Sequence, residues 1–550
     1  AWGLVHMDYW EPMVDAHFYG LRISPVLLPL GALGALLGTA PVLIVAQAAA
    51  LAAATFPLAR IGARHLGPAG ALAGAVAWLF HPNLGHVAGY EVHAGSMAAL
   101  PLAWLAWSLD RGSARALALG ALGVLACRED LALAVALAAG LFAWRHRRQW
   151  LAAAITGGTS LAYLLFFLLY LHPRYAPERG SLELHFGRFG SSAAEVALYL
   201  VSHPLELAAH LGTEERLLYL PKVLAPLALL PLLAPRWLLP AAPVLAINLV
   251  SEWPSTTDLG VHYLTPALPF LVAGALEGAG RLGARAPALA VAVPSAAALI
   301  AHVLAGGTPL SLDFDALAHR PDANTAAARA IVRAIPPGAS VQAPDALLPH
   351  LAERKVLRRA ASPETGADYL VLDVSHRRRF AATEDLLRTR EEPHVRTWLA
   401  RDDHRLVLAG GDYLLLERGK SPREGRGADA IVGRADPSRG RRIAACLAVL
   451  GAALEDDLLA LDFVAREPCP NDLAIRIGTG VRPERVDLLF GGWLSPSQVR
   501  RGDRLRSLHR LNEAEIARIR AEGLRVGALR SSGARPEHED PTSVPVALGE

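Results

Sequence analysis

The sequence has only three cysteines among its 550 residues. Their spacing matches no structural zinc site, because such sites use closely spaced pairs of Cys or His ligands. Cys127 lies in an apolar region, whereas Cys446 and Cys469 lie in a polar one. The last two could form a disulfide if that region is outside the cytoplasm, or could remain unpaired small hydrophobic residues.

Excess charge of one sign is also lacking. The chain has 54 Lys and Arg residues against 51 Asp and Glu residues, which gives a formal net charge of +3. No basic stripe with interleaved aromatic residues is present. Nucleic-acid-binding surfaces need such a stripe, so we expect no nucleic-acid partner.

The first residues lack the features of a signal peptide. The chain starts at Ala1 without Met, and no basic segment followed by an apolar run and small residues is found there. We therefore expect the natural chain to extend upstream of Ala1.

What the sequence does have is an excess of apolar residues, which is segregated. Hydrophobic residues make up 53% of the chain and charged residues 19%. Up to about Ala305, runs of Ala, Leu, Val and Gly dominate, whereas from about Asp313 charged residues recur every few positions. This pattern predicts a membrane half, mainly α-helical, followed by a soluble half.

The membrane half is organised around the stretch Ala114 to Trp144, which is apolar except for Arg128, Glu129 and Asp130. At about 1.5 Å per residue and about 30 Å of hydrocarbon, the stretch is too long for one upright helix. It fits two short helices that meet at this charged triplet, at a membrane surface. Charges so close to lipid usually face a wet cavity, which makes the triplet a candidate functional site.

We expect about ten or eleven spans within residues 23–305, after an outer loop with interfacial helices over residues 1–22. The first, Ile23 to Leu37, carries two prolines and could cross fully or re-enter. The other expected spans are Pro41 to Arg60, Ala69 to Leu84, Gly95 to Leu109, Arg115 to Cys127, Leu131 to Trp144, Trp150 to Leu171, Leu217 to Leu233, Trp237 to Val250, Tyr263 to Leu282 and Pro287 to Ala305.

Short basic loops set the orientation, because Arg and Lys are retained on the cytoplasmic side. Placing the Arg145, Arg147 and Arg148 cluster inside puts every other short basic loop inside as well. The triplet, the loop His172 to Arg216 and everything after Ala305 then lie outside. We predict an integral protein of the bacterial inner membrane with an extracytoplasmic C-terminal half.

The soluble half divides at a segment rich in Gly, Arg, Ser and Pro. Residues 306–418 predict a small α/β domain, including a hairpin that turns at Gly410-Gly411 and a helix near Glu384 to Arg390. Residues 419–441 predict a linker. Short alternating apolar runs over residues 442–550 predict a β-rich domain, in which Ile443 to Leu454 is core.

The expected topology gathers acidic residues and histidines on the outer face. Catalytic candidates are Glu91, His93, Asp8 and Asp15, because a carboxylate near a histidine can accept a proton, orient a hydroxyl or bind a metal. The candidate substrate-binding residues are Arg128, Glu129, Asp130, His262 and Tyr263, with Glu252 and Asp258 nearby.

Each candidate also has a purely structural interpretation. The loop carboxylates would be solvated, Glu129 and Asp130 would cap the helix that begins at Leu131, and Arg128 would only neutralise them. His262 and Tyr263 would be an interfacial anchor. His172 and His203, each before a proline, are expected to be loop structure.

Several of these segments resemble a bacterial family of predicted membrane proteins with a domain of unknown function, which is similar to the GT-C glycosyltransferases. The resemblance spans roughly Ala1 to Arg418. Where relatives have Lys-Glu-Asp and an Asp-Phe-His-like segment, this chain has Arg128-Glu129-Asp130 and Glu91-Val92-His93. The remaining landmarks are Ile23 to Leu27, Asn248-Leu249, His262-Tyr263 and, more weakly, Pro349-His350.

The resemblance implies an inverting transfer of a sugar from a polyprenyl-phosphate donor on the extracytoplasmic face, with no certain cofactor and any divalent metal open. A first-loop acid or Glu91 would be the general base, supported by His93, and Arg128 would face the donor phosphate. GT-C enzymes place an essential acid in their first loop, which here lies at or upstream of Ala1. Asp8 and Asp15 are substitutes for it.

Two functions of other classes remain open. A non-catalytic carrier of a lipid-linked solute is disfavoured, because we find no internal repeat and no charge in the middle of a span once the triplet lies at a surface. An envelope-assembly scaffold would use the outer domains to recruit partners that the sequence does not identify. Membrane lipid is the one expected partner common to all three hypotheses.

Overall fold

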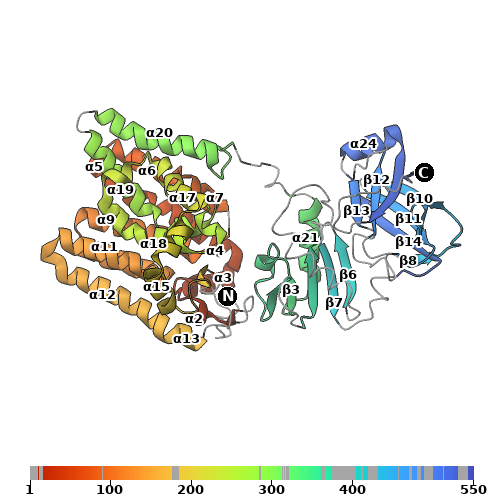
Figure 1. The fold of residues 1–550 in the computed structure, drawn as a ribbon, viewed down its shortest axis with the longest axis horizontal. Coiled ribbons are helices and arrows are strands. Elements are labelled where there is room, and N and C mark those ends of the chain that lie inside the picture. Colours follow the sequence, from red (N-terminus) through yellow and green to blue (C-terminus); the bar gives the residue numbers. More distant parts are fainter. Residues whose placement is uncertain are drawn as a thin grey trace. The chain divides into compact units, whose positions relative to one another are not determined.

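The computed structural model describes most of the chain, in two compact units, Ala1–Arg320 and Pro321–Glu550. The described residues are 10–11, 16–89, 91–175, 185–283, 286–312, 314, 316, 321, 323–360, 366–373, 404–410, 413–418, 431–455, 458–469, 473–479, 485–488, 499–511, 513–530 and 543–549. Figure 1 shows the helical first unit and the second unit with its sheets.

Apart from the two-residue strands β1 (Trp10–Glu11) and β2 (Ala16–His17), the described part of the first unit is helical. Its α-helices are α2 (Phe18–Leu21), α3 (Leu27–Leu37), α4 (Thr39–Ala53), α5 (Thr55–Leu66), α6 (Gly70–Leu79), α7 (Pro82–Gly89), α8 (Ala94–Met97), α9 (Ala99–Arg111), α10 (Ala114–Cys127), α11 (Ala132–Arg145), α12 (Trp150–Phe166), α13 (His172–Tyr175), α15 (Ala193–Ser202), α16 (Pro204–Leu211), α17 (Glu214–Leu224), α18 (Leu238–Val250), α19 (Leu268–Gly283) and α20 (Pro287–Ala305). Helices suit so apolar a sequence, because they satisfy their backbone hydrogen bonds internally.

The central prediction of the sequence is confirmed: two short helices, α10 and α11, meet at the triplet. The capping interpretation of Glu129 and Asp130 is wrong. Helix α11 has Leu131 as its N-cap and no side-chain hydrogen bond there, so neither carboxylate caps it. Both carboxylates are therefore available for another role.

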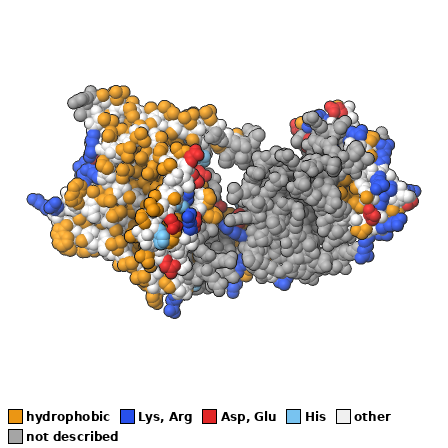
Figure 2. All heavy atoms as spheres, viewed as in Figure 1, with side chains coloured by type: hydrophobic (Ala, Val, Ile, Leu, Met, Phe, Trp, Pro, Cys, Tyr) orange, Lys and Arg blue, Asp and Glu red, His pale blue; other side chains and the backbone are white. Residues whose placement is uncertain are grey.

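Within the described residues, three helices are long and apolar enough to cross a membrane: Thr39–Leu66, Arg147–Tyr175 and Pro287–Ala305. Shorter apolar helices match most of the other expected spans, and the number of spans stays a prediction. Figure 2 shows hydrophobic side chains over much of the visible face of this unit. The exposed apolar residues of α3, α4 and α20 include Leu36, Val45 and Ile300, as expected for a surface in contact with lipid.

Three expected segments differ in the structure. The segment Leu217 to Leu233 is not one helix: α17 ends at Leu224 and two 3-10 turns follow, η3 (Ala225–Leu227) and η4 (Leu230–Leu233). Pro226 and Pro231 lack the N–H that an α-helix needs. Ala69 to Leu84 divides into α6 and α7, and the expected polar loop His172 to Arg216 contains helices α13, α15 and α16.

Helix α19 forms the centre of the first unit. Nearly all its residues are buried, among large core side chains such as Trp78, Trp237 and Phe142. Helices α5 and α6 approach so closely that a Cβ on Gly62 would lie 2.0 Å from the carbonyl oxygen of Gly70. Such contacts between small residues are a usual way of packing helices in membranes.

The second unit begins with an α/β region. Helix α21 (Ala323–Ala334) precedes a five-stranded sheet of order β4-β3-β5-β7-β6, in which β3 is parallel to β4 and β5. Its strands are β3 (Val341–Ala343), β4 (Leu357–Arg359), β5 (Tyr369–Asp373), β6 (His404–Gly410) and β7 (Tyr413–Arg418), with the 3-10 helix η8 (Leu348–Leu351) after β3. The predicted hairpin is confirmed as β6-β7, whereas the helix expected near Glu384 to Arg390 lies outside the described residues.

A β-rich region follows, as predicted. One sheet has the order β17-β10-β11-β14-β8, with β9 beside β10, and another has the order β13-β12-β15-β16. The elements are β8 (Ile431–Arg434), β9 (Arg441–Arg442), β10 (Leu447–Glu455), β11 (Leu458–Ala465), β12 (Leu473–Gly478), β13 (Arg485–Leu488), β14 (Asp503–Arg510), α24 (Glu513–Glu522), β15 (Leu524–Arg530), β16 (Val544–Val546) and β17 (Leu548–Gly549).

The end of the expected linker is part of this region. Strand β8 pairs with β14, and β9 pairs with β10, so at least residues 431–434 and 441 belong to a sheet. The Gly and Arg residues that suggested a flexible segment are accommodated at the sheet margin, where Gly433 has a φ of +150°. The rest of 419–430 lies outside the described residues.

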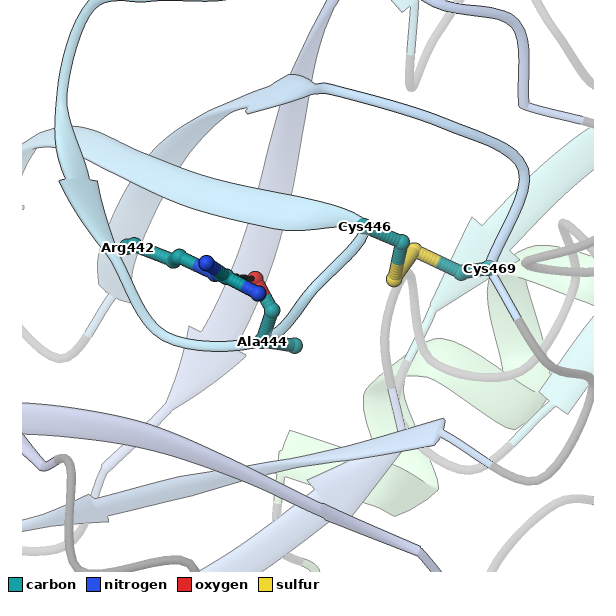
Figure 3. Close-up of a disulfide and its surroundings, with 4 residues drawn as sticks. All are labelled: Arg442, Ala444, Cys446 and Cys469. Atoms are coloured by element: carbon teal, nitrogen blue, oxygen red, sulfur yellow. Dashed lines mark hydrogen bonds between the residues drawn. A yellow bond between two sulfur atoms is a disulfide. The ribbon is translucent and has the colours of Figure 1, made fainter.

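Cys446 and Cys469 form a disulfide, the first of the two alternatives (Figure 3). Both side chains are buried in the core of the β-rich region. Arg442 donates from Nε to the carbonyl oxygen of Ala444, 3.2 Å away, in the turn that precedes Cys446. Cys127 is a free, buried cysteine.

Candidate functional site

A cavity of about 600 Å³ lies where the triplet meets α18 and the end of the long helix Arg147–Tyr175. Its polar lining residues are Arg128, Glu129, Asp130, His172, His185, Ser191, Ser192, Asn248, Thr256, His262 and Tyr263. Its apolar walls include Phe167, Leu168, Val244 and Ile247. All five predicted substrate-binding residues therefore line one cavity. The predicted topology had placed them on one face of the membrane.

Arg128 lies across the cavity wall, held by Asp130. Its Nε donates to Oδ1 of Asp130 over 2.9 Å, and its Nη2 donates to Oδ2. Gly95 makes room for it, since a Cβ there would come within 3.1 Å of Cδ of Arg128. Asp130 accepts only two of the five N–H bonds of the guanidinium, so Arg128 is oriented and still able to bind an anion.

Glu129 is the buried acid of the cavity. Its side chain is 6% exposed, and Oε2 accepts a hydrogen bond of 2.8 Å from the backbone N–H of Ile23. Burial first, and then the negative charge of Asp130, raises the pKa of Glu129 to about 7, against the opposing effect of Arg128. A carboxyl group with this pKa can exchange a proton near neutral pH.

Two histidines stack on each other at the cavity. The rings of His93 and His262 are 3.4 Å apart and 15° from parallel, and His262 also packs on Tyr263. Burial, with the positive charges of Arg22 and Arg128, lowers the pKa of His93 to about 4. Burial and the same neighbours lower the pKa of His262 well below its usual value, so both rings are neutral at pH 7.

The other predicted catalytic residues are placed differently. His93 is not among the cavity-lining residues but stacks on His262, which is, and its Nε2 lies 3.7 Å from Oε2 of Glu91. The Glu91 side chain is 67% exposed and is not among the cavity-lining residues. Asp8 and Asp15 lie outside the described residues.

Glu252 and Asp258 serve the neighbouring loops. Glu252 accepts from the N–H of Arg188, and its own N–H donates to the carbonyl oxygen of His185. Asp258 accepts from the N–H of Gly260 over 2.7 Å. The bonds of Glu252 fix the loop that brings His185 to the cavity, whereas the bond of Asp258 fixes a loop that does not line it.

The sequence interpretation missed two buried amides that position the histidines. In the middle of the apolar helix α4, Gln47 donates to the carbonyl oxygens of Val87 and Glu91 and accepts from the N–H of His93. Asn83 donates to the carbonyl oxygens of residues 259 and 261 and accepts from the hydroxyl of Thr265. A single amide within an apolar run was the available signal for Gln47, whereas Asn83 lies between His81 and His86 and has no such signal.

Among the residues that the structure describes, no group of three or more His, Cys, Asp or Glu side chains is arranged to hold a metal ion. The groups that the cavity does present are one guanidinium, one acid with a pKa near neutrality and neutral imidazoles. These groups suit a ligand that carries both an anionic and a hydroxylated part.

A family model described as "Predicted membrane protein (DUF2079)" matches residues 8–397. The chain belongs to this family. The predicted resemblance is confirmed for the family, and every DUF2079 landmark from Glu91 to His350 lies within the matched residues. No curated protein and no solved structure matches the chain, so the similarity of this DUF2079 protein to GT-C glycosyltransferases stays a prediction.

Proposed function

We propose that this DUF2079 protein is a membrane glycosyltransferase that takes its sugar from a polyprenyl-phosphate donor on the extracytoplasmic face. The observation that carries the proposal is the cavity, which combines apolar walls with an oriented guanidinium and an acid whose pKa is about 7. A lipid phosphate needs the first two features and a hydroxyl acceptor needs the third.

Arg128 would bind the donor phosphate. Its charge compensates the negative charge that grows on the phosphate oxygen as the bond from that oxygen to the anomeric carbon breaks. The lipid chain would leave along the apolar wall formed by Phe167, Leu168 and Ile247. Phe167 begins a π-helical turn over Phe167–Leu171, a local irregularity that is frequent at functional sites.

Glu129 would act as the general base, in place of the exposed Glu91. It would take the proton of the acceptor hydroxyl while that oxygen attacks the anomeric carbon, and the phosphate would leave with the bonding electrons. A single displacement inverts the configuration and needs one base. His262, stacked on His93, would orient the acceptor as a neutral hydrogen-bonding group.

Transfer from a polyprenyl-phosphate sugar by the purified full-length protein tests this proposal. We expect Glu129→Gln to reduce turnover by about 100-fold or more, the usual range for losing a general base, with donor binding retained. Glu91→Gln is the matched control and should keep most of the activity. Donor binding without turnover in the wild-type protein would instead favour the carrier hypothesis.

A further inference from the structure

A second hollow, of about 1100 Å³, lies beside α20 and is separate from the cavity. Helix α20 supplies its apolar wall with Ala297, Ile300, Ala301 and Leu304. His86 closes one end, where its Nε2 lies 2.9 Å from the carbonyl oxygen of Ala305. Since α20 is long and apolar enough to span a membrane, we call this hollow the α20 groove and place its wall against lipid.

Two carboxylates line the α20 groove near the loop that follows α18. Glu215 accepts a hydrogen bond from the hydroxyl of Thr257. Asp258, the next residue, is fixed by the N–H of Gly260. Both acids therefore lie at one polar edge of the groove, with their remaining oxygen lone pairs open to a donor.

Lys222 is the cation of the groove. It lies seven residues after Glu215 on α17, so the two Cα atoms are about 10 Å apart along the helix and on a similar face. It is the one lysine among residues 1–320 of the sequence. The ammonium group is exposed and makes no hydrogen bond or ion pair with any residue that the structure describes.

Lys222 lies near one end of the expected span Leu217 to Leu233. A lysine close to lipid is costly unless it binds an anion or reaches the interface.

We propose that the α20 groove binds a phospholipid with an ethanolamine head group. The order of charges matches this lipid: its terminal ammonium would meet Glu215 and Asp258, its phosphate would meet Lys222, and its acyl chains would lie along α20. A phosphatidylglycerol head offers no cation to the two acids, and a choline head has no N–H to donate. The α20 groove shares no lining residue with the cavity, so this inference does not depend on the proposed transferase activity.

Lipid binding to the delipidated full-length protein, measured by native mass spectrometry, tests the inference. We expect phosphatidylethanolamine to bind about tenfold more tightly than phosphatidylglycerol or phosphatidylcholine, since a charged hydrogen bond contributes about 1.5–3 kcal/mol. Equal binding of the three lipids would overturn the proposal.

Single substitutions test the contact to the lipid phosphate and the contact to the lipid ammonium separately. Lys222→Gln should weaken phosphatidylethanolamine and phosphatidylglycerol alike, whereas Asp258→Asn should weaken only the former. Lys222→Arg should retain binding, which keeps the test decisive if Lys222→Gln fails to fold. Lys355→Gln, at an exposed lysine of the second unit, is the charge-matched control. Unchanged affinity for both lipids in Lys222→Gln, or an unchanged lipid preference in Asp258→Asn, would also contradict the assignment.

Discussion

Single residues decide what the cavity can bind. Arg128 is held in place by Asp130, and Gly95 leaves the space that the guanidinium occupies. Arginine suits this role better than lysine, because its planar group can bind Asp130 along one edge and an anion along another. The geometry of the guanidinium, and not its charge alone, therefore decides how Arg128 binds an anion.

We expect Arg128→Lys to weaken binding of the lipid-phosphate donor by about tenfold, although charge is preserved, because Lys cannot bind both partners in this geometry. Donor titration followed by tryptophan fluorescence measures this. Arg188→Lys, at a residue whose N–H donates to Glu252, is the control and should leave binding unchanged. Full affinity in Arg128→Lys would show that charge alone is sufficient.

The neutral histidine pair predicts acid sensitivity. The folded protein holds the pKa of His93 near 4, below its ordinary value of 6.5. The unfolded chain therefore binds more protons between these values, and stability falls as pH drops through this window. Buried Glu129 acts in the opposite direction, because its raised pKa lowers stability as pH rises from 4.5 to about 7.

Thermal unfolding in detergent at several pH values separates the two effects. His262→Asn removes the stacking partner of His93, and we expect its melting temperature to fall less, or rise more, than that of the wild-type protein as the pH drops from 6.5 to 4. Glu129→Gln should change the profile in the opposite sense, so that its melting temperature falls less, or rises more, than that of the wild-type protein as the pH rises from 4.5 to 7. A wild-type pH profile in both variants would contradict the assigned protonation states.

At the scale of elements, side-chain amides join loops to helices. Gln47 of α4 bonds three backbone groups of the segment that carries His93. At another site, Gln149 does the same for the start of α10: it accepts from the N–H of Ala114 and donates to the carbonyl oxygen of Gly112. These two residues form a matched pair, one near the cavity and one away from it.

We expect Gln47→Leu to cost about 1–3 kcal/mol, because it leaves buried backbone groups unpaired, and also to weaken donor binding by displacing His93. Gln149→Leu, at a half-buried amide with two such bonds, should destabilise the protein less and leave donor binding unchanged. Denaturation and donor titration of both variants test this. Equal losses of donor binding in the two variants would show that Gln47 contributes to stability alone.

At the scale of the molecule, the disulfide Cys446–Cys469 bears on topology. Disulfides persist in oxidising compartments, which supports the proposal that the second unit is extracytoplasmic. The two cysteines are 23 positions apart in the sequence. Closing a loop of this length stabilises the fold by about 3 kcal/mol in the chain-entropy estimate.

In intact cells, we expect Cys446→Ser to make Cys469 reactive toward a membrane-impermeant maleimide, because its partner is gone and local opening of the fold exposes the thiol. The wild-type protein should react only after reduction, and buried Cys127 should remain unlabelled. Labelling that requires membrane permeabilisation would place the second unit inside and contradict the topology.

The sequence by itself determined the division into apolar and polar halves, the helix pair around the triplet and five of the residues that line the cavity. These depend on composition, on helix length against membrane thickness and on charges that lipid excludes, all of which are local properties of the chain. The β6-β7 hairpin was predictable for the same reason, since turn residues and alternation are local.

Only the tertiary structure decided which acid is buried. Glu91 and Glu129 look alike in the sequence, but the backbone of Ile23, 106 positions away, approaches only Glu129. The stacking of His93 on His262, the bonds of Gln47 and the groove at Lys222 likewise join segments far apart in the chain. Such contacts follow from how helices pack, which no local pattern of residues encodes.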